Sequence, residues 1–194
     1  MTQGAGSTDK NSAAAPASTG PSWVGRGCPE PPDHGLGRSR GGFTSKLHLI
    51  TDGRGRPISI GLTGGNVNDT AMLEPALGEI RVPRRGPGRP RTCPDGLLGD
   101  KGYSSRSNRQ RLARRGITAT IPERADQLAH RARRGSKGGR PYAFDAERYK
   151  RRNIVERCFS RLKQWRGVAT RYDKKAVNYR GGIVLASLII WLKS

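Results

Sequence analysis

Two acidic residues occupy positions from which they could bind a metal ion or move a proton. Asp100 ends the short apolar run LLGD, which predicts a buried strand, and open α/β sheets bind ligands in the crevice at the carboxyl ends of their strands. Glu156 lies in the stretch YKRRNIVERCFSRLKQW, whose apolar spacing predicts a helix. The alternatives are structural: Asp100 as a turn or helix-cap residue, and Glu156 as a surface residue.

Glu156 shares one side of the predicted helix with three other polar side chains. At about 100° per residue, Tyr149, Arg152, Glu156 and Lys163 fall within a stripe about 60° wide, and the apolar side chains face away from it. The sequence therefore places a carboxylate beside two cations and a phenol. The alternative is an exposed helix face with an i,i+4 pair of Arg152 and Glu156, worth only about 0.2–0.5 kcal/mol.

The elements around these residues predict an α/β fold. FTSKLHLIT and PISIGLT alternate like strands, and DGRGRP between them predicts a hairpin turn at Asp52. Asn68 or Asp69 is a candidate cap for the next helix. The order hairpin, helix, strand, helix, strand, long helix favours a mixed sheet with flanking helices. The later elements are expected as a strand ending at 100, a helix from 104 or 105 to 112, a strand over 116–122, a basic loop or insertion over 123–144, and helices over 146–166 and 174–192.

The composition points to a polyanionic partner. The 194 residues include 37 Lys and Arg against 15 Asp and Glu, which gives a formal net charge of +22. Such a field favours nucleic acid and argues against a typical enzyme of small anionic metabolites. Residues 1–40 are rich in Gly, Ser, Ala and Pro, so we predict a disordered basic tail there and a folded domain over 41–194. No membrane span is expected, and three cysteines suggest reduced thiols in a cytoplasm.

The motifs together resemble those of a known family. GDKGYSS, combined with Tyr149, Arg152, Glu156 and Lys163 separated by two, three and six residues, resembles the DDE transposases of bacterial insertion sequences, in the group with a Tyr-Arg-Glu-Lys helix motif. The lead-in GRSRGGFTSKLHLITDGRGRPISIGLTGGNVNDTAML is similar to the strand pair and following helix of those enzymes. The resemblance covers about residues 36–194, with a helix motif that fixes both identities and spacings.

The resemblance implies a fold, a reaction and a set of roles. The family's domain is ribonuclease H-like, with two Asp and one Glu holding two Mg²⁺ ions, for which Mn²⁺ can substitute, and it catalyses DNA strand cleavage and transfer at transposon ends. By the match, Asp100 is the second acidic ligand and Glu156 the third. Arg152 and Lys163 would contact end phosphates, and Tyr149 would lie near the DNA end. Transposon ends, target DNA and a second copy of the chain are the implied partners, in the cytoplasm and at the nucleoid.

The sequence departs from the family at the first catalytic aspartate. That residue lies on a first strand ahead of the hairpin, but Asp9 and Asp33 have no apolar run beside them and Asp52 is predicted in the turn. Asp69 matches a family position, yet helix capping is its expected role. The prediction is therefore a partial catalytic domain without its first strand. The chain would be incomplete or inactive unless an upstream segment supplied the strand and its aspartate.

Two further segments are strongly basic. RRGPGRPR carries Arg84, Arg85, Arg89 and Arg91 and resembles a minor-groove Gly-Arg-Pro hook, with a basic linker that touches only phosphates as the alternative. HRARRGSKGGR is expected to be a phosphate-contact loop or a disordered insertion. His48 alternates with strand residues and is predicted to be an ordinary surface histidine.

A different class of function is compatible with the same composition. The chain could be a non-catalytic basic DNA- or RNA-binding protein, attracted to phosphates by charge alone. The two readings differ in one structural expectation. Asp100 and Glu156 converge in a transposase, whereas they stay apart or solvated in a simple binding protein.

Overall fold

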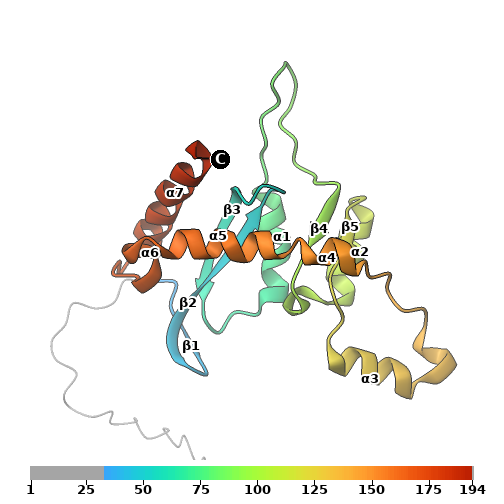
Figure 1. Ribbon diagram of the computed structural model, residues 1–194. Coiled ribbons are helices and arrows are strands. Elements are labelled where there is room, and N and C mark those ends of the chain that lie inside the picture. The colour runs from blue at the N-terminus through green and yellow to red at the C-terminus, as the bar shows by residue number, and fades with distance from the viewer. Residues whose placement is uncertain (1–32, 194) are drawn as a thin grey trace, which may run out of the picture. The chain divides into compact units, whose positions relative to one another are not determined.

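The computed structural model describes residues 33–193, which form a mixed α/β structure (Figure 1). This confirms the predicted α/β class. Its strands are β1 (Gly37–Ser39), β2 (Gly42–Thr51), β3 (Pro57–Gly64), β4 (Gly96–Leu98) and β5 (Thr118–Thr120). Its helices are α1 (Asp69–Gly78), η1 (Lys101–Tyr103), α2 (Arg106–Arg114), α3 (Ala125–Arg133), η2 (Gly135–Gly138), α4 (Ala146–Lys150), α5 (Asn153–Lys163), α6 (Arg166–Thr170) and α7 (Ala176–Leu192).

The predicted hairpin is present and its turn is built on an aspartate. β2 and β3 pair antiparallel from Ser45↔Gly64 to Ile50↔Ser59. Between them Asp52 Oδ1 accepts hydrogen bonds of 2.9 Å from the backbone N–H groups of Arg54 and Arg56. Such local carboxylate bonds favour a turn over continued strand, so Asp52 has the structural role that the sequence predicted.

The first described strand, β1, begins before the expected boundary at residue 40. β1 pairs antiparallel with β2, from Gly37↔Thr44 to Ser39↔Gly42. A side chain at Gly37 would collide with Asn66, so the glycine that looked like tail composition permits a close approach of two backbones. The rest of the predicted tail, residues 1–32, lies outside the described residues.

The strands form two sheets rather than the single mixed sheet that was expected. β1, β2 and β3 make an antiparallel sheet, and β4 and β5 make a parallel pair with Leu97↔Ala119 at its centre. Within residues 33–193 no strand hydrogen-bonds the two sheets together. Both contribute to one hydrophobic cluster, in which α1 and α2 pack against side chains of β2, β3, β4 and β5.

A second cluster covers the other face of the hairpin. Leu47, Leu49 and Ile60 pack there against Cys158 and Leu162 of α5 and against α6 and α7. Figure 1 shows α5 crossing β2. The alternation of β2 therefore sends its leucines to α5 and α7, and its other face, with His48 and Ile50, toward α1. Helix α5 is thus fixed on the hairpin, and its stripe of polar residues stays outside the core.

Two predicted segments differ in local structure. Residues 123–144, expected to be a loop or insertion, contain α3 and η2. The helix is anchored because Gln127 exchanges two hydrogen bonds with Ser104, Oγ to Oε1 and Nε2 to backbone O, each 2.9 Å. The helix expected over 146–166 breaks into α4 and α5, with i to i−3 backbone bonds at the junction, such as that from Arg152 N to Tyr149 O.

The last helix agrees with the prediction to within two residues of its start. α7 spans Ala176–Leu192 and buries Tyr179, Ile183 and Ile190. Neither it nor any other helix in residues 33–193 has the length and apolar content needed to cross a membrane.

Candidate functional site

Asp100 stands at the carboxyl end of β4, as the sequence predicted. Its backbone is extended, and its Oδ1 accepts a hydrogen bond of 2.7 Å from Lys101 N, which caps the short 3₁₀ helix η1. The side chain is exposed and makes no ion pair within residues 33–193. Asp100 can cap η1 and still be exposed, because only one of its two carboxylate oxygens accepts the capping hydrogen bond.

Several polar contacts hold the loop after Asp100 in place. Thr70 Oγ1 donates to Gly102 O at 3.1 Å. The buried Asn108 of α2 donates through Nδ2 to Thr70 O at 3.0 Å and to Tyr103 O at 3.2 Å. The side-chain amide of Asn108 therefore joins three segments: the first turn of α1, the loop after Asp100 and the first turn of α2. Since a buried amide needs partners, this junction fixes the strand-end aspartate relative to α1.

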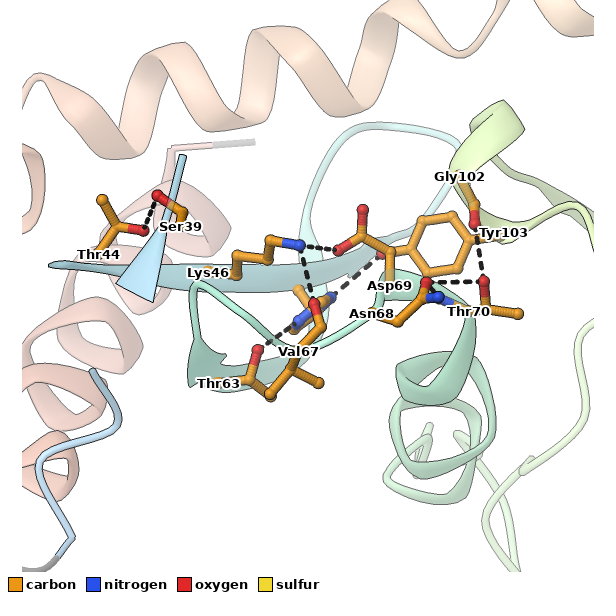
Figure 2. A network of polar contacts seen from close by, with 11 residues as sticks. Ser39, Thr44, Lys46, Thr63, Val67, Asn68, Asp69, Thr70, Gly102 and Tyr103 are labelled. Carbon is orange, nitrogen blue, oxygen red and sulfur yellow. Dashed lines mark hydrogen bonds and ion pairs between the residues drawn. The ribbon is translucent and has the colours of Figure 1, made fainter. Parts of the chain in front are cut away.

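A polar network lies beside this loop, on the face of the hairpin that faces α1 (Figure 2). Lys46 Nζ donates to Val67 O at 2.8 Å and pairs with Asp69 Oδ1 at 3.1 Å. His48 Nε2 lies 2.8 Å from Thr63 Oγ1, and its Nδ1 lies 3.3 Å from Tyr103 OH. The network therefore links the hairpin to both α1 and the loop that follows Asp100.

Two residues of this network have roles other than those predicted. Asn68, not Asp69, caps α1, because its Oδ1 accepts from Thr70 N at 3.0 Å. Because Asn68 caps the helix, the Asp69 carboxylate pairs with Lys46 and lies close to Gly102. A Cβ atom added at Gly102 would lie 3.3 Å from Asp69 Oδ2. His48, predicted at the surface, is 4% exposed. Burial lowers the pKa of His48, with Asp69 opposing that shift and Lys46 adding to it.

The sequence of β2 alone carries no signal for this network. Lys46 and His48 alternate with Leu47 and Leu49 on β2, and the leucines face the core between the hairpin and α5. A strand with one apolar face normally turns its other face to water. Here α1 and η1 cover His48, whereas the side chain of Lys46, paired with Asp69, remains 37% exposed.

The residues of the Tyr-Arg-Glu-Lys motif keep their common side despite the break between α4 and α5. Arg152 Nε donates to Tyr149 OH at 3.2 Å, and both terminal nitrogens of Arg152 contact Glu156 Oε1 at 2.8 Å. The backbone turn between α4 and α5 continues the helical winding, so the three side chains still contact one another. Lys163 lies two turns beyond Glu156, at the exposed end of α5.

Tyr149 connects the two predicted acidic positions. Burial raises the pKa of Tyr149, Arg152 opposes that shift, and the negative charges of Asp100 and Glu156 both add to it. Burial likewise raises the pKa of Tyr103 to about 12, with Asp69 and Asp100 as further causes. The negative charge of Asp100 therefore contributes to the raised pKa of both phenols, together with Asp69 at Tyr103 and with Glu156 at Tyr149.

The donor set suits a hard cation only in part. Mg²⁺ prefers oxygen ligands, keeps several waters and is commonly held by one or two carboxylates, which Asp100 and Glu156 could supply. Among residues 33–193, however, no three His, Cys, Asp or Glu side chains are gathered closely enough to hold a metal ion. Glu156, with its side chain 59% exposed, is instead paired with Arg152. The described residues therefore do not contain the set of three acidic ligands that the resemblance implies.

The four arginines of RRGPGRPR are placed in two ways. Arg84, Arg85 and Arg89 are exposed and make no hydrogen bond or ion pair with any of the described residues. Arg91 instead pairs with Asp95 and donates through Nε to Cys93 O at 2.9 Å. Three of the predicted DNA contacts are therefore available to a ligand, and the fourth is engaged within the chain.

Comparison with known proteins agrees with the resemblance. Residues 20–191 match the transposase DDE domain family. A protein of Burkholderia cepacia assigned as the transposase of insertion sequence element IS402 is 34% identical over 148 residues, which are 76% of this chain and 60% of that protein. A protein of Brucella ovis assigned as the transposase of element IS6501 is 27% identical over 151 residues, 78% of this chain and 100% of that protein.

The extent of these matches defines what they establish. No solved structure matched the chain. The chain spans about three fifths of the length of the IS402 protein, and the family match covers most of the chain, from before the hairpin to the end of α7. The chain belongs to the transposase DDE domain family.

Proposed function

We propose that the chain is the catalytic part of an insertion-sequence transposase, which cleaves and transfers DNA strands at the element's ends with the help of divalent metal ions. The observation that supports this most strongly is the match of residues 20–191 to the transposase DDE domain family, together with the contacts that hold Tyr149, Arg152 and Glu156 on one side of α4 and α5. The proposal requires Asp100 and Glu156 to converge on one site, which a simple nucleic-acid-binding protein does not. The DDE transposase family generally uses divalent metal ions.

In this proposal Asp100 and Glu156 are ligands of the ions. Mg²⁺ or Mn²⁺, when bound, supplies charge stabilisation to the attacking and leaving oxygens of an in-line displacement at a phosphodiester. Arg152 holds Glu156 through two nitrogens on one oxygen, so the second carboxylate oxygen remains open. Arg152 and Lys163 would contact end phosphates, with Tyr149 beside the DNA end.

We infer that the fold is ribonuclease H-like with its first strand missing from the described part. Two observations support this inference: both sheets pack on the same pair of helices, and no strand joins them within residues 33–193. An unpaired strand edge presents backbone N–H and C=O groups that can pair with an added strand. A segment encoded upstream would fill this position and bring the third carboxylate. A second copy of the chain, and association with the nucleoid, belong to the same proposal.

Strand cleavage tests the proposal. The chain is assayed with a labelled duplex carrying the element's end and flanking DNA, with Mg²⁺ or Mn²⁺, and with or without the upstream segment in trans. We expect cleavage only with the segment present, and its loss in both Asp100→Asn and Glu156→Gln. Asp126→Asn, at an exposed carboxylate on α3 away from these residues, is the matched control and should retain cleavage. Cleavage that survives Glu156→Gln would overturn the assignment.

One observation favours a second candidate, a non-catalytic basic DNA- or RNA-binding protein. It is that no three His, Cys, Asp or Glu side chains among residues 33–193 are grouped so that they could hold a metal ion. The same assay separates the two functions, because such a protein would bind the duplex without cleaving it, whatever segment is added. Its binding would also fall steeply with salt, through release of counterions, without preference for the element's end.

A further inference from the structure

We propose that residues 83–90 form an arm that inserts arginine side chains into the narrow minor groove of A·T-rich duplex DNA. The inference deepens the proposed function, since it concerns how the same chain would select its DNA. It rests on the shape of the segment and on its charge, neither of which involves the carboxylates.

The base of the arm is closed by backbone pairing. Val82 N donates to Arg91 O at 2.9 Å and Arg91 N donates to Val82 O at 2.8 Å, an antiparallel bridge outside the named strands. Arg91 is further held by Asp95 and by Cys93 O. Figure 1 shows the segment between these residues extending away from the helices and strands. The two limbs therefore leave the domain side by side from a fixed base.

The charge of the arm is of one sign and is not neutralised within the described chain. Residues 83–90 are all exposed and include Arg84, Arg85 and Arg89 without an acidic residue. None of these three guanidinium groups has a hydrogen-bond or ion-pair partner among residues 33–193. Unpaired arginines cost little in water, but they repel one another, so their grouping is explained by an anionic ligand.

The backbone of the arm is slender and restricted. Gly86 and Gly88 add no side-chain bulk, a Cβ atom at Gly86 would meet nothing within 4 Å, and Gly88 has a φ of +131°, which other residues rarely adopt. Pro83, Pro87 and Pro90 each fix φ, which lowers the entropy lost when the arm is ordered on a ligand. A minor groove is only about 6 Å wide, so it admits a thin backbone with arginines but not a helix.

Arginine in such a groove responds to DNA sequence. A·T-rich tracts narrow the minor groove and strengthen its negative potential, which attracts inserted arginines. Guanidinium is more weakly hydrated than ammonium and so loses less on entering a confined groove. A basic linker that touches only phosphates would make no such distinction between A·T and G·C pairs.

Fluorescence anisotropy of the full chain with two labelled duplexes of equal length, one A·T-rich and one G·C-rich, tests the arm at fixed salt. We expect the chain to bind the A·T-rich duplex about tenfold more tightly, within the range of one or two favourable contacts. In the triple variant Arg84→Lys, Arg85→Lys and Arg89→Lys the ratio should fall toward one, while the conserved charge keeps binding to the G·C-rich duplex. The control Arg106→Lys with Arg114→Lys, at two exposed residues of α2, should keep the ratio.

Each outcome decides the proposal. Equal affinity of the unchanged chain for both duplexes would overturn it, as would a ratio that persists in the triple lysine variant. Equal binding to duplex RNA, whose minor groove is wide and shallow, would contradict it too. The affinity ratio is independent of cleavage: a chain without cleavage activity can still show the ratio, and the triple lysine variant can lose it while retaining cleavage.

Discussion

Replacing Asn108 with alanine probes the junction that fixes the Asp100 loop. Asn108 is 2% exposed, and its Nδ2 donates to Thr70 O and Tyr103 O. Losing two such hydrogen bonds costs roughly 1–3 kcal/mol at about 0.5–1.5 kcal/mol each. About half a kcal/mol of this loss is offset, because alanine has a higher helix propensity than asparagine in α2. The net expectation is a loss of about 0.5–2.5 kcal/mol in the free energy of unfolding, centred on the loop after Asp100.

Urea unfolding measures the global effect, and amide hydrogen exchange of residues 101–104 measures the local one. Leu112→Ala is the matched control, because Leu112 lies on the same helix with 0% exposure and its truncation costs about 2–5 kcal/mol without removing a hydrogen bond to the loop. Asn108→Ala should speed exchange in residues 101–104 more than its global effect explains, and Leu112→Ala should not. If Asn108→Ala left both stability and loop exchange unchanged, the junction would not hold the loop.

Three further predictions concern charges. Two hydrogen bonds from Arg131 hold the pKa of Glu123 below its usual value, so the pair stabilises the fold fully above about pH 4.5 and stops doing so as the pH falls through the lowered pKa. Urea unfolding should show that Glu123→Gln lowers the free energy of unfolding at pH 7 and lowers it less in acid. An equal loss at both pH values would contradict this. Burial lowers the pKa of His48, so the unfolded chain takes up the proton first, and stability should fall as the pH drops below about 6.5. His48→Gln should make the free energy of unfolding, measured from unfolding curves at several pH values, less dependent on pH in this range. An unchanged pH dependence would assign the effect to other groups. Glu156→Gln should change stability by less than about 1 kcal/mol, since its pair with Arg152 is exposed, and a larger thermal shift would show a structural role.

Local sequence patterns were enough to predict much of the fold, the position of Asp100 after a strand and the shared side of Tyr149, Arg152 and Glu156. The alternation around Leu47 and Leu49 predicted the hairpin, the turn chemistry of Asp52 was recognised, and Asp100 follows a strand as expected. The polar stripe of Tyr149, Arg152 and Glu156 depends only on helical winding, so it survived a break in the helix that the sequence had not indicated.

The features that were missed depend on tertiary contacts. His48 was expected at the surface because nothing in β2 shows that α1 and η1 cover its polar face. Asp69 and its neighbour Asn68 are both good caps, and only the structure shows that Asn68 caps the helix while Asp69 pairs with Lys46. The apolar residues of α3, Ala125, Leu128, Ala129 and Ala132, have helical spacing, but none is buried, and the surrounding basic residues favoured a loop. The helix is anchored by the hydrogen bonds between Gln127 and Ser104, which the sequence does not show.

Binding of Mn²⁺ by the chain tests most directly whether Asp100 and Glu156 form one site. Titration followed by electron paramagnetic resonance, with the upstream segment present, gives the affinity for the unchanged chain and for Asp100→Asn, Glu156→Gln and Asp126→Asn. The proposal predicts that each of the first two substitutions weakens binding by about tenfold or more and that the third does not. Affinity that is unchanged in either Asp100→Asn or Glu156→Gln would show that the two carboxylates do not share an ion, and the catalytic assignment would fail.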